Sequence, residues 1–187
     1  MQLATWAHDL AESLLAESLP KRWAHSKRVY SQALTLAPAL GEDAELLAAA
    51  AIAHDVGYAQ AAVDTKQHMI DGARYLRDVV GADPRLCSLV AFHTSSPWEA
   101  SELGLTEALA EFGPAEPDLV DAITFCDLTS SPTGALVDPG ERLAEVLERY
   151  GAEHVVYRAV SAARPELLAM VDRVKQRRAE AEGWALS

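Results

Sequence analysis

The stretch "AAAAIAHDVGY" (residues 48–58) begins as an alanine-rich apolar run and ends with a histidine and an aspartate side by side. An apolar run of this kind, within a longer segment of helical periodicity, predicts a buried helix. Titratable side chains at the edge of a core cost free energy unless other groups pair with them. The partners of His54 and Asp55 must therefore come from elsewhere in the chain.

Apolar residues recur with helical spacing along nearly the whole chain, and no run of alternating β-branched residues is present. Asp83-Pro84 and Asp138-Pro139 have the pattern of an N-cap followed by a first-turn proline. Glycines at positions 57, 81 and 151 are predicted helix ends. The fold class that follows is all-α, with helices predicted over residues 3–18, 20–37, 43–56, 67–80, 84–94, 97–103, 117–130, 139–150, 153–163 and 165–182.

Composition excludes several classes of function. The formal net charge of −12 argues against a nucleic-acid polymer as partner, because such surfaces are basic. No uninterrupted apolar stretch approaches 18 residues, so we expect no membrane span. The first residues are typical of an amphipathic helix rather than a signal peptide. Cys87 and Cys126 form no disulfide framework, so we expect a cytoplasmic location.

Four of the six histidines have distinctive settings. His25 lies early in a predicted helix, His54 precedes Asp55 at a helix end, His68 lies near a helix start, and His93 closes the apolar run "LCSLVAFHT". A later apolar run carries an aspartate, Asp127, at a position where a core-facing side chain is expected.

The order of these residues resembles that of the HD superfamily of metal-dependent phosphohydrolases. The resemblance is carried by His25, His54-Asp55, His68, His93 and Asp127, and covers roughly residues 20–135. It is strongest to the branch with two extra histidines, which holds two metals. The implied fold is an HD-domain helical bundle with additional N- and C-terminal helices. We predict a single domain over residues 1–187, with a metal-binding core over about 20–135 and C-terminal helices over about 139–182.

The resemblance implies a ligand set for each of two metals. The first would be held by His25, His54, Asp55 and Asp127, and the second by His68 and His93 with Asp55 bridging. Imidazole and carboxylate together suit divalent transition metals, iron or manganese first and zinc, cobalt, nickel or magnesium as alternatives. His54 and Asp55 are the predicted catalytic residues, because metals held there would activate a water that attacks phosphorus.

Substrate contacts are predicted from cationic residues and one tyrosine near these ligands in the sequence. Arg28, Lys66, Arg74 and Tyr58 are the candidates for binding a small anionic, phosphorylated substrate. A solvated surface charge is the alternative for each cation, and for Arg22 and Lys27 nearby. Asp71 follows His68 by one helical turn and is either a partner that orients this ligand or an ordinary early-helix carboxylate. Residues 95–117 are a candidate lid.

Three functions compete. The first is hydrolysis of a phosphate ester or anhydride of a small nucleotide-like substrate. The second is a mixed-valent diiron oxygenase of the same fold. In that group, the resemblance implies a lysine three residues after the aspartate of the His-Asp pair, where this chain has Tyr58. The third is a non-catalytic domain that senses a metal or nucleotide. The first and last helices would form a homodimer surface or cover the core.

Overall fold

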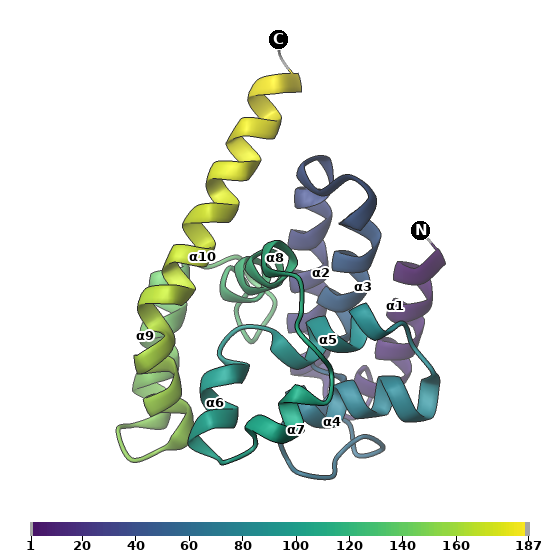
Figure 1. Ribbon diagram of the computed structural model, residues 1–187, viewed down its shortest axis with the longest axis vertical. Coiled ribbons are helices and arrows are strands. Elements are labelled where there is room, and N and C mark those ends of the chain that lie inside the picture. The colour runs from purple at the N-terminus through teal and green to yellow at the C-terminus, as the bar shows by residue number, and fades with distance from the viewer. Residues whose placement is uncertain (1, 186–187) are drawn as a thin grey trace.

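The computed structural model describes residues 2–185, which form helices and one isolated antiparallel β-bridge between Ser130 and Leu136. Short 3-10 helices cover Gly41–Asp43 (η1) and Val56–Tyr58 (η2), and a π-helix covers Tyr75–Val80 (η3). The α-helices, shown in Figure 1, are Gln2–Leu15 (α1), Pro20–Leu40 (α2), Ala44–Ala53 (α3), His68–Arg74 (α4), Pro84–Phe92 (α5), Ser96–Glu102 (α6), Thr106–Ala110 (α7), Pro117–Leu128 (α8), Pro139–Tyr150 (α9) and Val155–Ala185 (α10). The prediction of an all-α fold is confirmed.

Helix α3 is the centre of the core. Every side chain from residue 46 to residue 53 is buried, and α1, α2, α5 and α8 pack around it. Most of these side chains are alanines, whose small size allows the neighbouring helices to approach closely. A helix that is apolar on all sides removes its side chains from water only when other elements surround it. The alanine-rich run therefore fixes α3 in the interior and delivers His54 and Asp55 at its end.

Gly57 has a different role from the helix stop predicted for it. A Cβ at this position would lie 2.0 Å from the carbonyl oxygen of His68 and 2.6 Å from the amide nitrogen of Gly72. Both neighbours are backbone atoms, so the contact between η2 and α4 requires a glycine here. This close crossing sets the distance between Asp55 and the first residue of α4.

Two prolines lie inside helices that the sequence predicted to end before them. Helix α2 continues through Pro38 to Leu40, and α10 continues through Pro165, so the predicted helices 153–163 and 165–182 are one. A proline within a helix frees the carbonyl four residues earlier. These carbonyls belong to Leu34 and Ser161, both exposed residues. Because water can bond to the freed carbonyls, neither proline ends its helix.

Other boundaries follow local chemistry. Asp83 accepts a hydrogen bond from the amide of Arg85 at 2.8 Å, and Asp138 accepts one from the amide of Gly140 at 2.8 Å, so both predicted N-caps are confirmed. The predicted helix 43–56 ends three residues early, because the chain turns at the His-Asp pair. The segment between α6 and α8 contains one short helix, α7.

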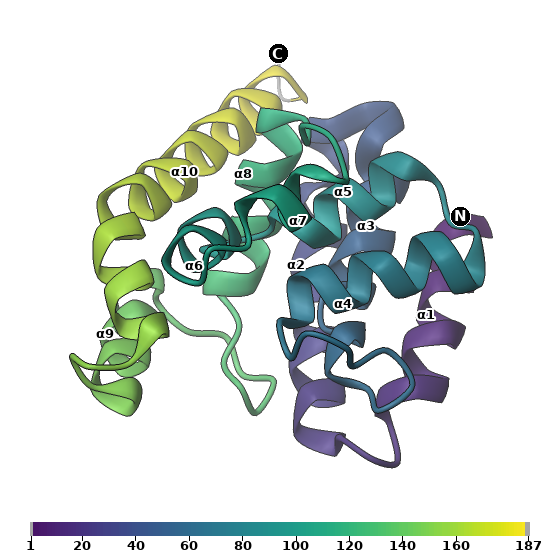
Figure 2. The ribbon, with the colours of Figure 1, turned by 60° about the horizontal axis from the view of Figure 1, so that its bottom comes forward.

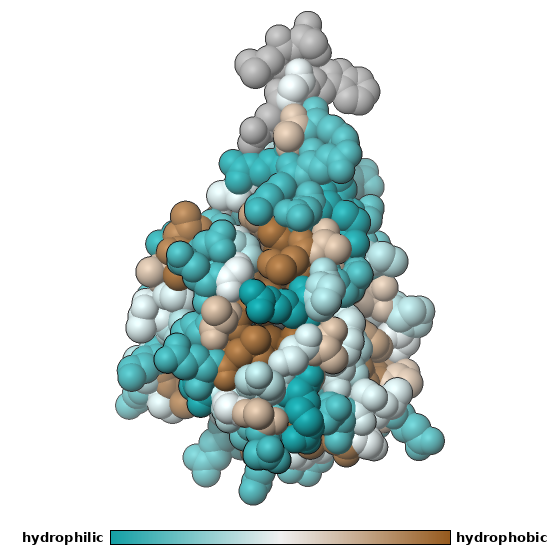
Figure 3. All heavy atoms as spheres, turned by 90° about the vertical axis from the view of Figure 1, so that its left-hand side faces the viewer, coloured by the Kyte–Doolittle hydropathy of each residue, from teal (hydrophilic) through white to brown (hydrophobic). Residues whose placement is uncertain are grey.

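Helices α9 and α10 stand on the side of the molecule opposite α1 (Figures 1 and 2). Helix α10 packs against α8, α9, α6 and α2. The buried carboxylate of Asp121 on α8 ties it down by accepting two hydrogen bonds from Arg173 at 2.7 Å and one from Arg177 at 2.6 Å. The outer face of this side is mostly hydrophilic, with apolar patches between (Figure 3). Within residues 2–185, no helix has the length and apolar character needed to span a bilayer.

Candidate metal centre

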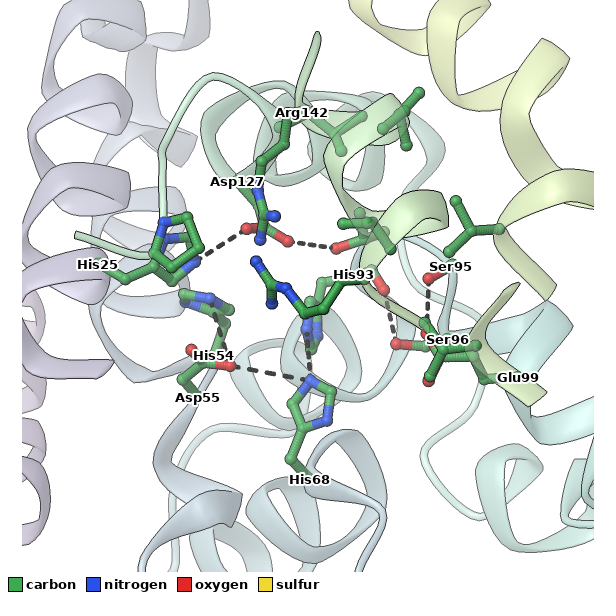
Figure 4. Close-up of a pocket in the computed structure, with 18 of the residues that line it drawn as sticks. His25, His54, Asp55, His68, His93, Ser95, Ser96, Glu99, Asp127 and Arg142 are labelled. Atoms are coloured by element: carbon green, nitrogen blue, oxygen red, sulfur yellow. Dashed lines mark hydrogen bonds and ion pairs between the residues drawn. The ribbon is translucent and has the colours of Figure 1, made fainter. Parts of the chain in front are cut away.

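The ends of several helices meet at one point and bring six titratable side chains together (Figure 4). His54 and His93 follow the last residues of α3 and α5, and His68 is the first residue of α4. At helix ends the chain changes direction, so adjacent residues can be aimed at a single site. We refer to these six side chains as the His/Asp cluster: His25, His54, Asp55, His68, His93 and Asp127.

Three of the four imidazoles are anchored by backbone carbonyls. The Nδ1 atom of His54 bonds to the carbonyl of Ala51 at 2.8 Å, and that of His93 bonds to Val90 at 2.7 Å. The Nδ1 atom of His25 lies 3.0 Å from the carbonyl of Ser131. A neutral imidazole that donates from Nδ1 keeps its lone pair on Nε2. These carbonyls therefore direct the Nε2 atoms into the centre of the cluster.

The Nε2 atoms face other side chains of the cluster. His54 Nε2 is buried without a hydrogen-bond partner. His25 Nε2 lies 2.9 Å from Asp127 Oδ1, and His68 Nε2 lies 3.2 Å from His93 Nε2. Ligand atoms bonded to one metal at about 2.1 Å and at right angles are about 3.0 Å apart. The donor set thus fits divalent metal ions.

Three triads within the cluster have ligand atoms all within 4.8 Å of one another. Asp55 Oδ1 lies 3.5 Å from His54 Nε2 and 3.8 Å from His68 Nε2. The Asp55 carboxylate therefore lies between His54 and His68. The triads are His25–His54–Asp55, His54–His93–Asp127 and Asp55–His68–His93.

Opposing forces set the pKa values of these groups. Burial acts to raise the pKa of Asp55, but electrostatic interactions with His54 and Arg22 outweigh it and hold the pKa well below its usual range. Burial, reinforced by His93, lowers the pKa of His68 to about 3. The site therefore favours an ionised carboxylate beside a neutral imidazole, the protonation states in which both bind metal ions.

Arg22 and Tyr58 form a layer against the cluster. The Arg22 guanidinium donates to Asp55 Oδ2 at 3.1 Å and lies 3.9 Å from the centre of the Tyr58 ring. On its other side, the Tyr58 ring stacks on His68 with 4.3 Å between ring centres. This layer neutralises Asp55 and restrains the plane of the His68 imidazole.

The cluster forms one wall of a cavity of about 310 Å³. Residues of α9 and α10 form the opposite wall, and most of these are apolar. The lining outside the cluster consists of Lys21, Arg22, Tyr58, Thr94, Ser95, Ser96, Glu99, Leu128, Pro132, Arg142, Leu143, Val146, Arg149, Tyr150, Val156, Val160 and Leu167. Of the candidate lid 95–117, residues 95, 96 and 99 are part of this lining.

Of the four predicted substrate contacts, only Tyr58 lines this cavity. Arg28 instead donates to the carbonyl of Gly134 at 2.8 Å and fastens the loop after α8 to α2. Arg74 forms a surface ion pair with Glu111. The backbone amide of Lys66 donates to Asp71 at 2.9 Å. Closeness in sequence to a ligand does not place these cations at the cavity, because Arg28 and Arg74 bind other parts of the chain.

Asp71 organises the loop before α4. Its carboxylate accepts hydrogen bonds from the backbone amides of residues 64, 65 and 66 and from the Thr65 hydroxyl, at 2.7–3.0 Å. Asp71 therefore positions the chain that leads into His68, a role that differs from both alternatives predicted for it, a partner that orients this ligand and an ordinary early-helix carboxylate.

The sequence interpretation missed the basic residues of α9. Arg142 and Arg149 line the cavity from the side opposite the cluster, together with Lys21 from α2. A signal was present, because residues 142, 146 and 149 share one helical face and Val146 on that face is apolar. The sequence did not indicate that this face of α9 would line the cavity next to the His/Asp cluster.

Comparison with known proteins agrees with this geometry. The family described as "HD domain" matches residues 22–130, more than half of the chain. No curated protein and no solved structure gives a significant match. The matched segment contains all six members of the His/Asp cluster and ends before α9. The chain therefore belongs to the HD-domain family, whose members are typically metal-dependent phosphohydrolases.

Proposed function

We propose that this protein hydrolyses a phosphate ester or anhydride of a small, nucleotide-like substrate, using two divalent metal ions held by the His/Asp cluster. His25, His54, Asp55 and Asp127 would hold one ion, and His68, His93 and the shared Asp55 the other. The observation that carries the proposal is the set of anchored imidazoles, which leaves His54 Nε2 buried without a hydrogen-bond partner. Iron and manganese are the preferred ions for this donor set.

The chemistry that such ions supply is Lewis acidity, which acidifies a water nucleophile and stabilises charge on a phosphoryl group. The protein residues supply position and charge. Lys21, Arg142 and Arg149 bring positive charge to a cavity in a chain of net charge −12, which favours an anionic substrate. Helices α9 and α10 cover the cavity and exclude water from one side.

Metal content per chain, measured by elemental mass spectrometry on protein purified without chelators, tests this proposal. Phosphate release should be assayed in parallel with nucleotides and small phosphate esters. We expect about two ions per chain and phosphate release. His54→Ala and Asp55→Ala should lose metal and turnover, whereas His93→Ala should lose only the second ion. His154→Ala, outside the cluster, is the matched control.

The other functions predict different results. Two irons per chain with oxygen consumption and no phosphate release would favour the oxygenase. Metal binding without any turnover would favour a sensing domain. Full metal occupancy in His54→Ala would contradict the ligand assignment, and absence of metal after reconstitution would contradict the proposal as a whole.

A further inference from the structure

Helix α9 presents a pair of converging arginines to the cavity. Arg142 and Arg149 are seven residues apart, which places them on the same helical face two turns from each other. Both guanidinium groups reach the single carboxylate of Glu145, which lies between them. Their donors therefore converge on one small volume that already holds an anionic group.

Exposure distinguishes Arg142 from the carboxylate that it shares with Arg149. The Arg142 side chain is only 13% exposed, whereas Arg149 is 39% and Glu145 45% exposed. Both arginines line the cavity, but Glu145 does not. Figure 4 shows the Arg142 side chain extending toward the same centre as Asp127. Glu145 is thus an exchangeable partner at the outer edge of a cationic subsite.

Charge distribution makes this arrangement informative. The chain has 28 acidic and 16 basic residues, so a cavity with Lys21, Arg22, Arg142 and Arg149 in its lining departs from the average surface. Arg22 is already committed to Asp55. The α9 pair faces the cluster across the cavity, where a reacting phosphoryl group would leave room for a second anionic group.

We propose that Arg142 and Arg149 form a subsite for a second phosphoryl group, so that the preferred substrate contains a phosphoanhydride rather than a single phosphate ester. This inference rests on the proposed phosphohydrolase function. Two guanidinium groups offer paired donors that match the three oxygens of a terminal phosphoryl group. The subsite lies outside residues 22–130, so it belongs to the part of the chain beyond the HD-domain match.

Binding of non-hydrolysable probes tests the subsite independently of turnover. Methylenediphosphonate, phosphonoacetate and methylphosphonate should be titrated calorimetrically into the metal-loaded full chain. We expect Arg142→Met/Arg149→Met to weaken methylenediphosphonate binding about tenfold and leave methylphosphonate binding nearly unchanged. Glu145→Gln should strengthen methylenediphosphonate binding, because it removes the competing carboxylate. Chelation of the metals by the probe is common to all variants and does not change this comparison.

Arg158→Met is the matched control, because Arg158 pairs with Glu102 outside the cavity. Equal loss of affinity for all three probes, or for none, in the double variant would overturn the inference. Binding of phosphonoacetate as tight as that of methylenediphosphonate would overturn the assignment to a phosphoryl group. Selective binding without phosphate release from any substrate would contradict the proposed function and support the subsite.

Discussion

The Thr94 hydroxyl donates a hydrogen bond of 2.7 Å to Asp127 Oδ2, from a backbone with φ of +51°. This region is strained for a β-branched residue, by about 1–2 kcal/mol. Asp127 Oδ1 meanwhile faces His25 Nε2 at 2.9 Å. Thr94 therefore fixes the carboxylate so that one oxygen is directed at the His/Asp cluster.

The effect of Thr94 on metal binding should be separable from its effect on the free energy of unfolding. Thr94→Gly relieves the strained φ but removes the hydroxyl, whereas Thr94→Ser keeps the hydroxyl. We expect the free energy of unfolding of Thr94→Gly to stay within about 1 kcal/mol of wild type, while its metal affinity falls about tenfold. Chelator competition and urea unfolding measure the two quantities. Loss of metal affinity in Thr94→Ser as large as in Thr94→Gly would contradict this role.

The close crossing of η2 and α4 predicts that Gly57→Ala is severe. The added Cβ would lie 2.0 Å from a backbone oxygen, so α4 must move and carry His68 with it. We expect a loss of about 3 kcal/mol or more in the free energy of unfolding, and loss of the second metal ion. Gly183→Ala is the matched control, because a Cβ there would meet no atom within 4 Å beyond its chain neighbours and its own helix backbone. Unchanged stability in Gly57→Ala would refute the crossing.

The His/Asp cluster was accessible to sequence analysis because most of its members lie where helices begin or end. An apolar run followed by a histidine or aspartate can be recognised locally, as for His54, His93 and Asp127. Arg142 and Arg149 could not be assigned in the same way. Their role depends on how α9 and α10 pack against α8 and α6, which is a long-range property.

The predicted helix ends at Pro38 and Pro165 were wrong for a related reason. Pro38 and Pro165 are local signals for a helix end, but their effect depends on whether the freed carbonyl faces water. That orientation is set by which side of α2 or α10 packs against the core. Asp71 likewise has the spacing of a partner for His68, yet the loop at 64–66 satisfies its carboxylate first.

The lowered pKa of His68 predicts acid sensitivity in the metal-free protein. The folded pKa is about 3 and the ordinary value is 6.5, so the unfolded chain binds more protons between these limits. The contribution of His68 to the free energy of unfolding is therefore fully present above pH 6.5 and is lost as the pH falls toward 3. His25, whose pKa is raised, contributes oppositely: its stabilisation is present below pH 6.5 and is lost at higher pH.

Comparison with His68→Gln isolates this contribution. Between pH 7 and pH 5, chelator-treated wild type should lose about 2 kcal/mol more than the variant in the free energy of unfolding. Urea denaturation at the two pH values measures the difference, and His154→Gln should behave as wild type. An equal loss in His68→Gln and wild type would show that His68 does not stay neutral when folded.

Arg22 is the counter-ion of Asp55 in the metal-free protein, through a bond of 3.1 Å to a carboxylate that is only 2% exposed. Arg22→Met should therefore destabilise the chelator-treated protein by about 2 kcal/mol, a value reduced from that of a fully buried pair because the arginine is 34% exposed. Metal ions would neutralise Asp55 in place of the guanidinium, so the deficit should shrink when metal is bound. By linkage, the metal affinity of Arg22→Met should rise about tenfold or more.

Chelator competition and urea unfolding with and without metal measure both effects of Arg22→Met. Lys21→Met is the control, because it removes a neighbouring charge of the same cavity. A fall in metal affinity in Arg22→Met would show instead that Arg22 holds Asp55 in position for the metal.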